Sequence, residues 1–338
     1  MQFELILVWF EFAVCIGVIG FAGVKLSKYG DLIADKTGLG GTWIGLVLLA
    51  TVTSLPELVT GLTSVTFANV PDIAAGDVLG SCVFNLVIIV LLDFLYRGEL
   101  VFTRAKQGHI LSAGFGIILI GFTGFNILLS GNGGNIAFWH IGFYSYVIIF
   151  LYIIAMRTVY RYEMQQIEVF AEKEPDRHPE ISLDQAVLRY LGNALLVIIA
   201  GSFLPFIAKN IATLMAWHES FVGTLFVAFA TSLPEMVVSI AALRIGAIDM
   251  AIGNLFGSNM FNILILAIDD VFYTEGPLFS FIAPTHAVSA LSAMMMTGVA
   301  IVGLLYRPKN RVFKTVGWAS IFLFSVYLLN SYVMYLYS

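Results

Sequence analysis

Apolar runs of about 20 residues recur along the whole 338-residue chain. A helix of that length crosses roughly 30 Å of hydrocarbon, and only helices and closed barrels satisfy their backbone groups in lipid. Hydrophobic residues make up 59% of the chain and charged residues only 12%, whereas soluble domains carry about 25% charged residues. A soluble fold would leave too much apolar surface in water. The sequence therefore predicts an all-α integral membrane protein.

Turn and charge signals divide the chain into predicted spans. The clearest breaks are Gly40-Gly41, Asn69-Val70-Pro71 and the glycine-rich segment 131–134. We interpret the first apolar run as a span and not as a signal peptide, because no basic segment precedes it. Ten spans result, at roughly 5–26, 43–68, 72–95, 107–129, 138–157, 185–208, 221–244, 249–272, 285–306 and 314–337.

Basic residues are concentrated in alternate loops. The loops after the odd-numbered spans hold all of the 17 Lys and Arg residues except Lys209. The positive-inside rule places these loops in the cytoplasm and both termini outside. We expect a multi-pass protein of the plasma (inner) membrane of a prokaryote. Both cysteines, Cys15 and Cys82, fall inside spans, so they offer neither a disulfide framework nor a zinc cluster.

The widest break between spans divides the chain into two halves. It is charged and predicted to be cytoplasmic, and it joins two groups of five spans; a plain connector and a regulatory segment both remain open for it. The predicted domains are a first five-span repeat at 1–157 with its motif at 43–95, a cytoplasmic connector at 158–184, and a second five-span repeat at 185–338 with its motif at 221–272.

The two halves share a sequence. The pentapeptide Thr-Ser-Leu-Pro-Glu occurs at 53–57 and again at 231–235, each time in the middle of an apolar run. The match continues after each copy, with 72–85 resembling 249–262. Lipid-facing packing does not call for recurrent Thr, Ser, Pro, Glu and Asn, which indicates a duplication. Because five spans separate the copies, the second runs through the membrane in the opposite direction. Such inverted repeats place paired sites near the midplane.

Each copy sets a carboxylate beside a helix-breaking proline. Pro56 lacks an amide hydrogen and frees carbonyl groups around Val52 and Thr53, and Pro234 does the same in the second copy. Free carbonyls at membrane depth need a partner or must line a cavity. A carboxylate at that depth, here Glu57 or Glu235, indicates a functional site.

The neighbouring spans add polar rows. Asp77, Ser81 and Asn85 share one helix face, and Asn254, Ser258 and Asn262 share another, with small residues beside them that allow close helix packing. All candidate ligands are oxygens, the set preferred by hard cations such as Ca²⁺, Mg²⁺ and Na⁺. The candidate metal ligands are Glu57, Glu235, Thr53, Ser54, Thr231, Ser232, Ser81, Asn85, Ser258, Asn262 and Asp77.

Single acidic residues leave alternatives open. Asp77 is interpreted either as an added ligand or proton site, or as a solvated carboxylate at a cavity rim. Asp93, Asp269 and Asp270 fall near span ends, where a solvated or pathway role is expected. The two negative charges of the glutamates neutralise one Ca²⁺ ion. A few Na⁺ ions or protons could neutralise them in place of Ca²⁺. A site that must stay charge-balanced in every loaded state favours exchange over uniport.

The duplicated pattern resembles the α-repeats of the cation/Ca²⁺ exchanger superfamily, and most of all its sodium/calcium exchanger branch. Residues 53–57 with Gly80, Ser81 and Asn85 carry the resemblance, as do residues 231–235 with 257–259 and Asn262. It implies central Ca²⁺ ligands at the two glutamates, Ca²⁺ and Na⁺ sites at the Thr, Ser and Asn residues, and first and sixth spans that slide to alternate access. It also implies an antiporter and not an enzyme, with Ca²⁺ and Na⁺ as transported ions and no cofactor.

Some residues depart from the family pattern. Val52 and Ala230 stand where glycine is usual, Cys82 replaces an asparagine, and Asp77 stands where the second repeat has Asn254. These departures leave coupling ion and stoichiometry open. Proton-coupled exchange and exchange of another divalent cation are the nearest alternatives; a cation channel and an intramembrane enzyme are more distant. The expected partners are the ions, H⁺ among the alternatives, and the lipid bilayer, and nothing resembles a nucleic-acid surface.

Overall fold

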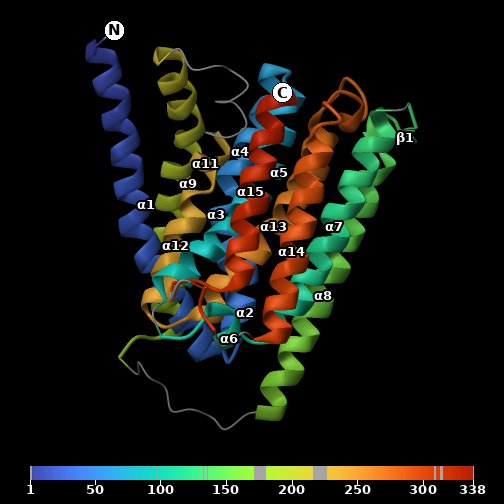
Figure 1. The fold of residues 1–338 in the computed structure, drawn as a ribbon. Helices are drawn as coiled ribbons and strands as arrows, with labels where there is room; N and C mark the ends of the chain where they lie inside the picture. Colours follow the sequence, from blue (N-terminus) through green and yellow to red (C-terminus); the bar gives the residue numbers. More distant parts are fainter. Residues whose placement is uncertain are drawn as a thin grey trace.

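The computed structural model describes residues 2–96, 98–131, 133–134, 136–170, 180–215, 227–307, 310–312 and 315–337. Within these residues, ten helices are long and apolar enough to cross a membrane. This confirms the predicted number of spans. The helices lie side by side in one bundle, and both ends of the chain lie at the same end of it, opposite α2 and α6 (Figure 1).

The second and seventh spans are each built from short helices in series, whereas the other spans are single helices. In the first half the elements are α1 (Gln2–Thr37), α2 (Gly41–Trp43), η1 (Ile44–Leu49), α3 (Ala50–Thr53), α4 (Leu55–Thr63), η2 (Ser64–Ala68), α5 (Pro71–Leu95), α6 (Val101–Arg104), α7 (Gly108–Gly131), β1 (Ala137–Phe138), β2 (Ile141–Gly142) and α8 (Phe143–Phe170). In the second half they are α9 (Leu183–Leu214), α11 (Val227–Thr231), α12 (Leu233–Arg244), α13 (Ile248–Phe272), η4 (Leu278–Ser280), α14 (His286–Tyr306) and α15 (Trp318–Tyr337).

Three predicted spans have wrong boundaries. The first was placed at 5–26, but α1 continues to Thr37, because the basic residues after position 24 end the apolar run without ending the helix. The fifth was placed at 138–157, but a short antiparallel hairpin occupies 137–142 and α8 runs on to Phe170. The sixth was placed at 185–208, but α9 continues to Leu214. Residues 221–226 of the predicted seventh span, and 171–179 of the predicted connector, lie outside the described residues. The division into domains stays a prediction.

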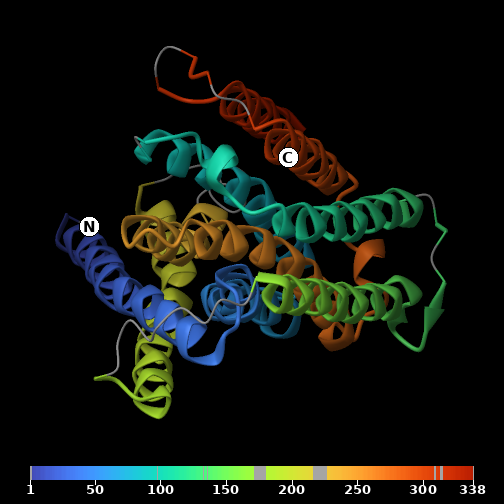
Figure 2. The ribbon, with the colours of Figure 1, turned by 90° about the horizontal axis from the view of Figure 1, so that it is seen from below.

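Helix α13 is the centre of the bundle. It contacts α4, α5, α7, α8, α12 and η1. Helices α1 and α9 pack on each other at one edge, and α7 and α8 lie at the opposite edge, as the view from below shows (Figure 2). The polar motifs of the second, third, seventh and eighth spans therefore belong to the interior of the bundle.

Glycines allow α13 to lie against η1. A Cβ on Gly253 would lie 2.6 Å from the Thr42 carbonyl oxygen, and one on Gly257 would lie 2.7 Å from Leu46 Cα and 2.8 Å from Ala50 Cβ. Backbone atoms cannot move aside as a flexible side chain can. The predicted packing role of the small residues is therefore met at these two positions.

We expect Gly257→Ala to destabilise the protein by about 1–3 kcal/mol, because the added methyl group overpacks a helix–helix contact. The measurement is the thermal melting temperature of the purified protein in detergent. The matched control is Gly116→Ala, at a buried glycine of α7 where a Cβ meets nothing within 4 Å. An equal melting temperature for the two variants would contradict the packing argument.

Acidic residues at corresponding positions of the two halves hold the ends of α5 and α13 by hydrogen bonds to neighbouring segments. Near their C-terminal ends, Asp93 accepts hydrogen bonds from Val101 N, Gly317 N and Ser320 Oγ. Asp270 accepts them from Leu278 N, Gly142 N, Ser145 Oγ and Tyr144 Oη. Both carboxylates are fully buried. The expectation that Asp93 and Asp270 are solvated was wrong, because they are buried and backbone amides and hydroxyl groups donate hydrogen bonds to them.

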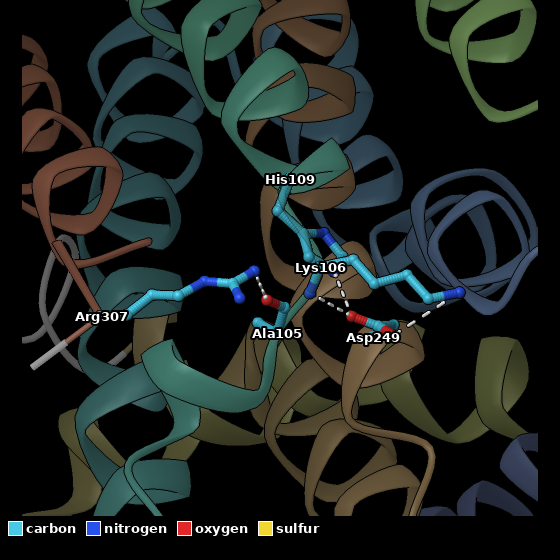
Figure 3. A network of polar contacts seen from close by, with 5 residues as sticks. All are labelled: Ala105, Lys106, His109, Asp249 and Arg307. Atoms are coloured by element: carbon cyan, nitrogen blue, oxygen red, sulfur yellow. Dashed lines mark hydrogen bonds and ion pairs between the residues drawn. The ribbon is translucent and has the colours of Figure 1, made fainter. Parts of the chain in front are cut away.

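The first turns of these helices are fastened in the same way. Asp249 Oδ1 accepts from Lys106 N at 2.8 Å and lies 3.0 Å from His109 Nε2, while Lys106 Nζ lies 4.0 Å from Oδ2 (Figure 3). The corresponding Asp72 lies 3.0 Å from His286 Nε2 and accepts from Ala283 N at 2.7 Å. The same types of contact therefore recur at matched positions of the two halves.

Candidate cation-binding site

Both copies of the pentapeptide break their span. Helix α3 ends at Thr53 and α4 begins at Leu55, with Ser54 at φ −91° and ψ 7° between them. In the second copy α11 ends at Thr231 and α12 begins at Leu233, with Ser232 at φ −81° and ψ 2°. The break comes where the proline two residues later removes a helical amide hydrogen. The predicted interruption is therefore present in both halves.

The two breaks lie next to each other. A Cβ added to Gly201 of α9 would lie 2.6 Å from Pro56 Cγ and 3.4 Å from Pro234 Cγ. One position of one helix thus contacts both prolines, although the two prolines are 178 residues apart in the sequence. Ser54 Oγ also donates a hydrogen bond to Glu235 Oε1 at 2.8 Å, which joins the two copies directly.

Each copy also bonds to the polar row of the opposite half. Thr53 Oγ1 donates to Asn254 Oδ1 at 3.3 Å, and the matched Thr231 Oγ1 donates to Asp77 Oδ1 at 2.8 Å. Ser232 Oγ donates to Ser81 Oγ at 2.9 Å. The polar interior is therefore built across the interface between the halves, and neither half forms it alone.

All of the candidate ligands from the sequence are buried in the interior of the bundle. Each of them has no solvent-exposed area: Thr53, Ser54, Glu57, Asp77, Ser81, Asn85, Thr231, Ser232, Glu235, Ser258 and Asn262. The burial of Asp77 disagrees with the alternative of a solvated rim carboxylate. That these residues bind an ion stays a prediction.

Several oxygens in this interior accept no well-formed hydrogen bond from the described residues. They are both carboxylate oxygens of Glu57, Glu235 Oε2, Asp77 Oδ2, Asn85 Oδ1 and Asn262 Oδ1. A buried polar atom without a partner is costly. Oxygens of this kind match the ligands that Ca²⁺ and Na⁺ take.

The acidic side chains are close enough to repel one another. Glu57 interacts electrostatically with Glu235 and Asp77. None of the ion pairs found in the described part of the chain involves these three carboxylates. Buried like charges without a base favour a bound cation or proton between them. Over the described residues no three His, Cys, Asp or Glu side chains form a metal cluster, so neutral oxygens would complete a cation site here.

Some residues at this site were not among the predicted ligands. Asn259 donates to the Cys82 carbonyl oxygen and accepts from Asn85 Nδ2, both at 3.0 Å. Asn254 Nδ2 donates to Ser239 Oγ at 3.0 Å. The match of Asn254 to Asp77 was a usable signal, whereas nothing in the sequence marked Gly201 or Ser239.

Comparison with known proteins assigns the family. The family model described as "Sodium/calcium exchanger protein" matches residues 7–161 and 186–333, which together include both copies of the motif. The chain belongs to this family. Membership and the ten apolar helices make it an integral, multi-pass membrane protein, and they support a transporter of the cation/Ca²⁺ antiporter kind.

The relatives include both named and uncharacterised proteins. The inner membrane protein YrbG of Escherichia coli is 25% identical over 301 residues, 89% of each chain. The uncharacterised membrane protein MJ0091 of Methanocaldococcus jannaschii is 27% identical over 237 residues, 69% of this chain and 71% of its own length. The sodium/calcium exchanger MaX1 of Methanosarcina acetivorans is 46% identical over 63 residues, 18% of each chain.

A solved exchanger shares the fold. Structures of the sodium-calcium exchanger NCX_Mj soaked with Na⁺ and Sr²⁺ superpose with a TM-score of 0.73 at 20% sequence identity, over 96% of this chain and 98% of that one. The same protein soaked with Na⁺ and Ca²⁺ gives a TM-score of 0.69 at 21% identity. The likeness extends over nearly all of both chains.

Proposed function

We propose that the protein exchanges Ca²⁺ for Na⁺ by alternating access at the site between the two broken helices. The ions are its cargo and no cofactor takes part. The observation that carries the proposal is the contact between the two copies of the pentapeptide. They meet at Gly201 and through Ser54, and they bring two glutamates into one buried cluster of oxygens.

Charge balance favours exchange over one-way transport. Two negative glutamates balance one Ca²⁺, and Na⁺ ions restore the balance when Ca²⁺ leaves. An empty site would leave buried charges unpaired, a state that is costly at membrane depth. The relatives support the choice of ions, since MaX1 is named a sodium/calcium exchanger and NCX_Mj was soaked with Na⁺, Ca²⁺ and Sr²⁺. Protons or another divalent cation are the alternatives at the same site.

The proposal includes an inverted repeat with both termini outside, in the plasma membrane of a prokaryote. The hydrogen-bonded acids at corresponding positions of α5 and α13 support the repeat. Both chain ends lie at the end of the bundle opposite α2 and α6 (Figure 1), and the basic loops follow the odd-numbered spans. Inverted repeats of this kind rock or slide around a fixed central site.

Helices α1 and α9 are the candidates for the moving part. They pack on each other, and α1 contacts α12 while α9 contacts α4 and α11. A Cβ on Gly23 of α1 would lie 3.2 Å from side-chain carbons of Val237 and Val238. The pair therefore touches both broken spans, so that its displacement can open the site on either side.

We expect purified protein in liposomes loaded with Na⁺ to take up radiolabelled Ca²⁺ when diluted into Na⁺-free buffer. Liposomes with equal Na⁺ on both sides, and protein-free liposomes, are the controls. The Na⁺ gradient drives Ca²⁺ inward if the outward movement of Na⁺ is coupled to the inward movement of Ca²⁺. Uptake that ignores Na⁺ and follows an imposed pH difference would replace Na⁺ by H⁺, and currents far above carrier turnover would indicate a channel.

A further inference from the structure

Asp269 is a buried acid with no hydrogen-bond donor among the described residues. It has no exposed area, and no described residue donates to either of its carboxylate oxygens. Its neighbour Asp270 differs sharply, because four donors hold that carboxylate. Asp269 follows Asn262 by seven residues on α13 and so lies on the same helix face, two turns nearer the C-terminal end of the helix.

A glycine opens a place for this carboxylate. A Cβ on Gly61 of α4 would lie 2.7 Å from Asp269 Oδ1 and 2.8 Å from Asp269 Cγ. Gly61 stands four residues after Glu57, so both lie on one face of α4. The carboxylate of Asp269 therefore rests against the backbone of the broken span, one turn from a central glutamate.

Asp77 is the acid that links this carboxylate electrostatically to the central site. Asp269 interacts electrostatically with Asp77, and Asp77 does so with Glu235. Asp77 uses one oxygen to accept from Thr231 and leaves Oδ2 without a donor among the described residues. Glu235, Asp77 and Asp269 thus form a row of interacting acids, and its last member stands near the C-terminal end of α13.

The other half of the molecule lacks this row. The position that matches Asp269 is Leu92, which is fully buried, and the position that matches Asp77 is Asn254. In place of Gly61 stands Ser239, which accepts a hydrogen bond from Asn254 Nδ2 at 3.0 Å. Leucine and satisfied amides fill the matched space, so the repeat does not need an acid there for packing.

We propose that Asp269, the α4 backbone at Gly61 and the free oxygen of Asp77 form a second cation position beside the central site, and that it takes Na⁺. The ligands are hard oxygens. Asp77 is shared with the central site, so Asp269 is the one carboxylate that only this position uses. Its single negative charge balances a monovalent ion, whereas a divalent ion would leave a net charge among apolar residues. Present on one side of the centre only, this position makes the two halves of the ion path unequal. This inference rests on the proposed function, in which Na⁺ is the coupling ion.

The test is equilibrium binding of radiolabelled Na⁺ to the purified full-length protein without Ca²⁺, with radiolabelled Ca²⁺ binding measured in parallel. We expect Asp269→Asn to bind one Na⁺ fewer per protein, or to need at least about fivefold more Na⁺ for half-saturation, with Ca²⁺ affinity changed less than about twofold. Gly61→Ala should reproduce the Na⁺ defect, because its methyl group occupies the place of the carboxylate.

The control is Glu275→Gln, which removes an equal charge at an exposed position just after α13 and should bind Na⁺ like the wild type. Melting temperatures check that each variant is folded. Unchanged Na⁺ binding by Asp269→Asn overturns the proposal, as does wild-type protein that binds no Na⁺. Because binding is measured without transport, a failure of Na⁺-driven Ca²⁺ uptake is a separate result that refutes the proposed exchange alone.

Discussion

Glu57→Gln is expected to abolish exchange, with a fall of about 10²–10³-fold in Ca²⁺ affinity and in the initial rate of Na⁺-driven Ca²⁺ uptake. The substitution keeps the shape of the side chain and removes one charge. Removing one partner from a buried charged contact costs about 3–5 kcal/mol, and each 1.4 kcal/mol is about tenfold in an equilibrium constant. Neither carboxylate oxygen of Glu57 accepts a well-formed hydrogen bond from the described residues, so both oxygens are available to a cation.

The same variant is expected to be more stable than the wild type when no cation is present. Glu57 lies near Glu235 and Asp77, and the neutral amide removes that repulsion. Ca²⁺ should then raise the melting temperature of the wild type and leave that of the variant unchanged, because a ligand stabilises only the state that binds it. Glu275→Gln, at an exposed position, is the control for charge. A variant that still exchanges Ca²⁺ at more than a tenth of the wild-type rate would refute the central role of Glu57.

The centre of the site was accessible to prediction because membrane interiors penalise polar groups. A Glu, a Pro and several hydroxyl and amide residues within apolar runs have no packing purpose in lipid, so their repetition identified the residues that meet in the structure. The odd number of spans between the copies supplied the expected direction of the second one. Thr53, Thr231, Ser54 and Glu235 do contact residues of the opposite half.

The surroundings of the site were less accessible, because their roles depend on partners far away in the sequence. Nothing next to Gly201 in the chain indicates that two prolines from different spans will touch it. Asp270 and Asp269 are adjacent acids near a span end, yet one has four donors and the other has none among the described residues.

Apolar runs also report membrane depth and not helix length, which is why the boundaries of α1 and α8 were wrong.

Gly201→Ala is expected to lower the rate of Ca²⁺ exchange by about tenfold or more while Ca²⁺ binding persists. Its methyl group would lie 2.6 Å from Pro56 Cγ and 3.4 Å from Pro234 Cγ, so α9 must shift away from one broken span or the other. Overpacking of this kind costs about 1–3 kcal/mol. If α9 moves past the prolines during each cycle, that cost differs between the inward-open and outward-open states. The conversion of one state into the other then becomes slower.

The contrast with Gly192→Ala decides whether the effect belongs to this contact. Gly192 lies on the same helix, and a Cβ there meets nothing within 4 Å, so that variant should transport at the wild-type rate. Initial rates of Na⁺-driven Ca²⁺ uptake would be compared with the Ca²⁺-induced rise in melting temperature for both variants. Loss of transport with the thermal shift retained places the defect in the motion of α9. Loss of both signals would place it in the binding site, and wild-type rates for Gly201→Ala would remove the contact between α9 and the two prolines from the mechanism.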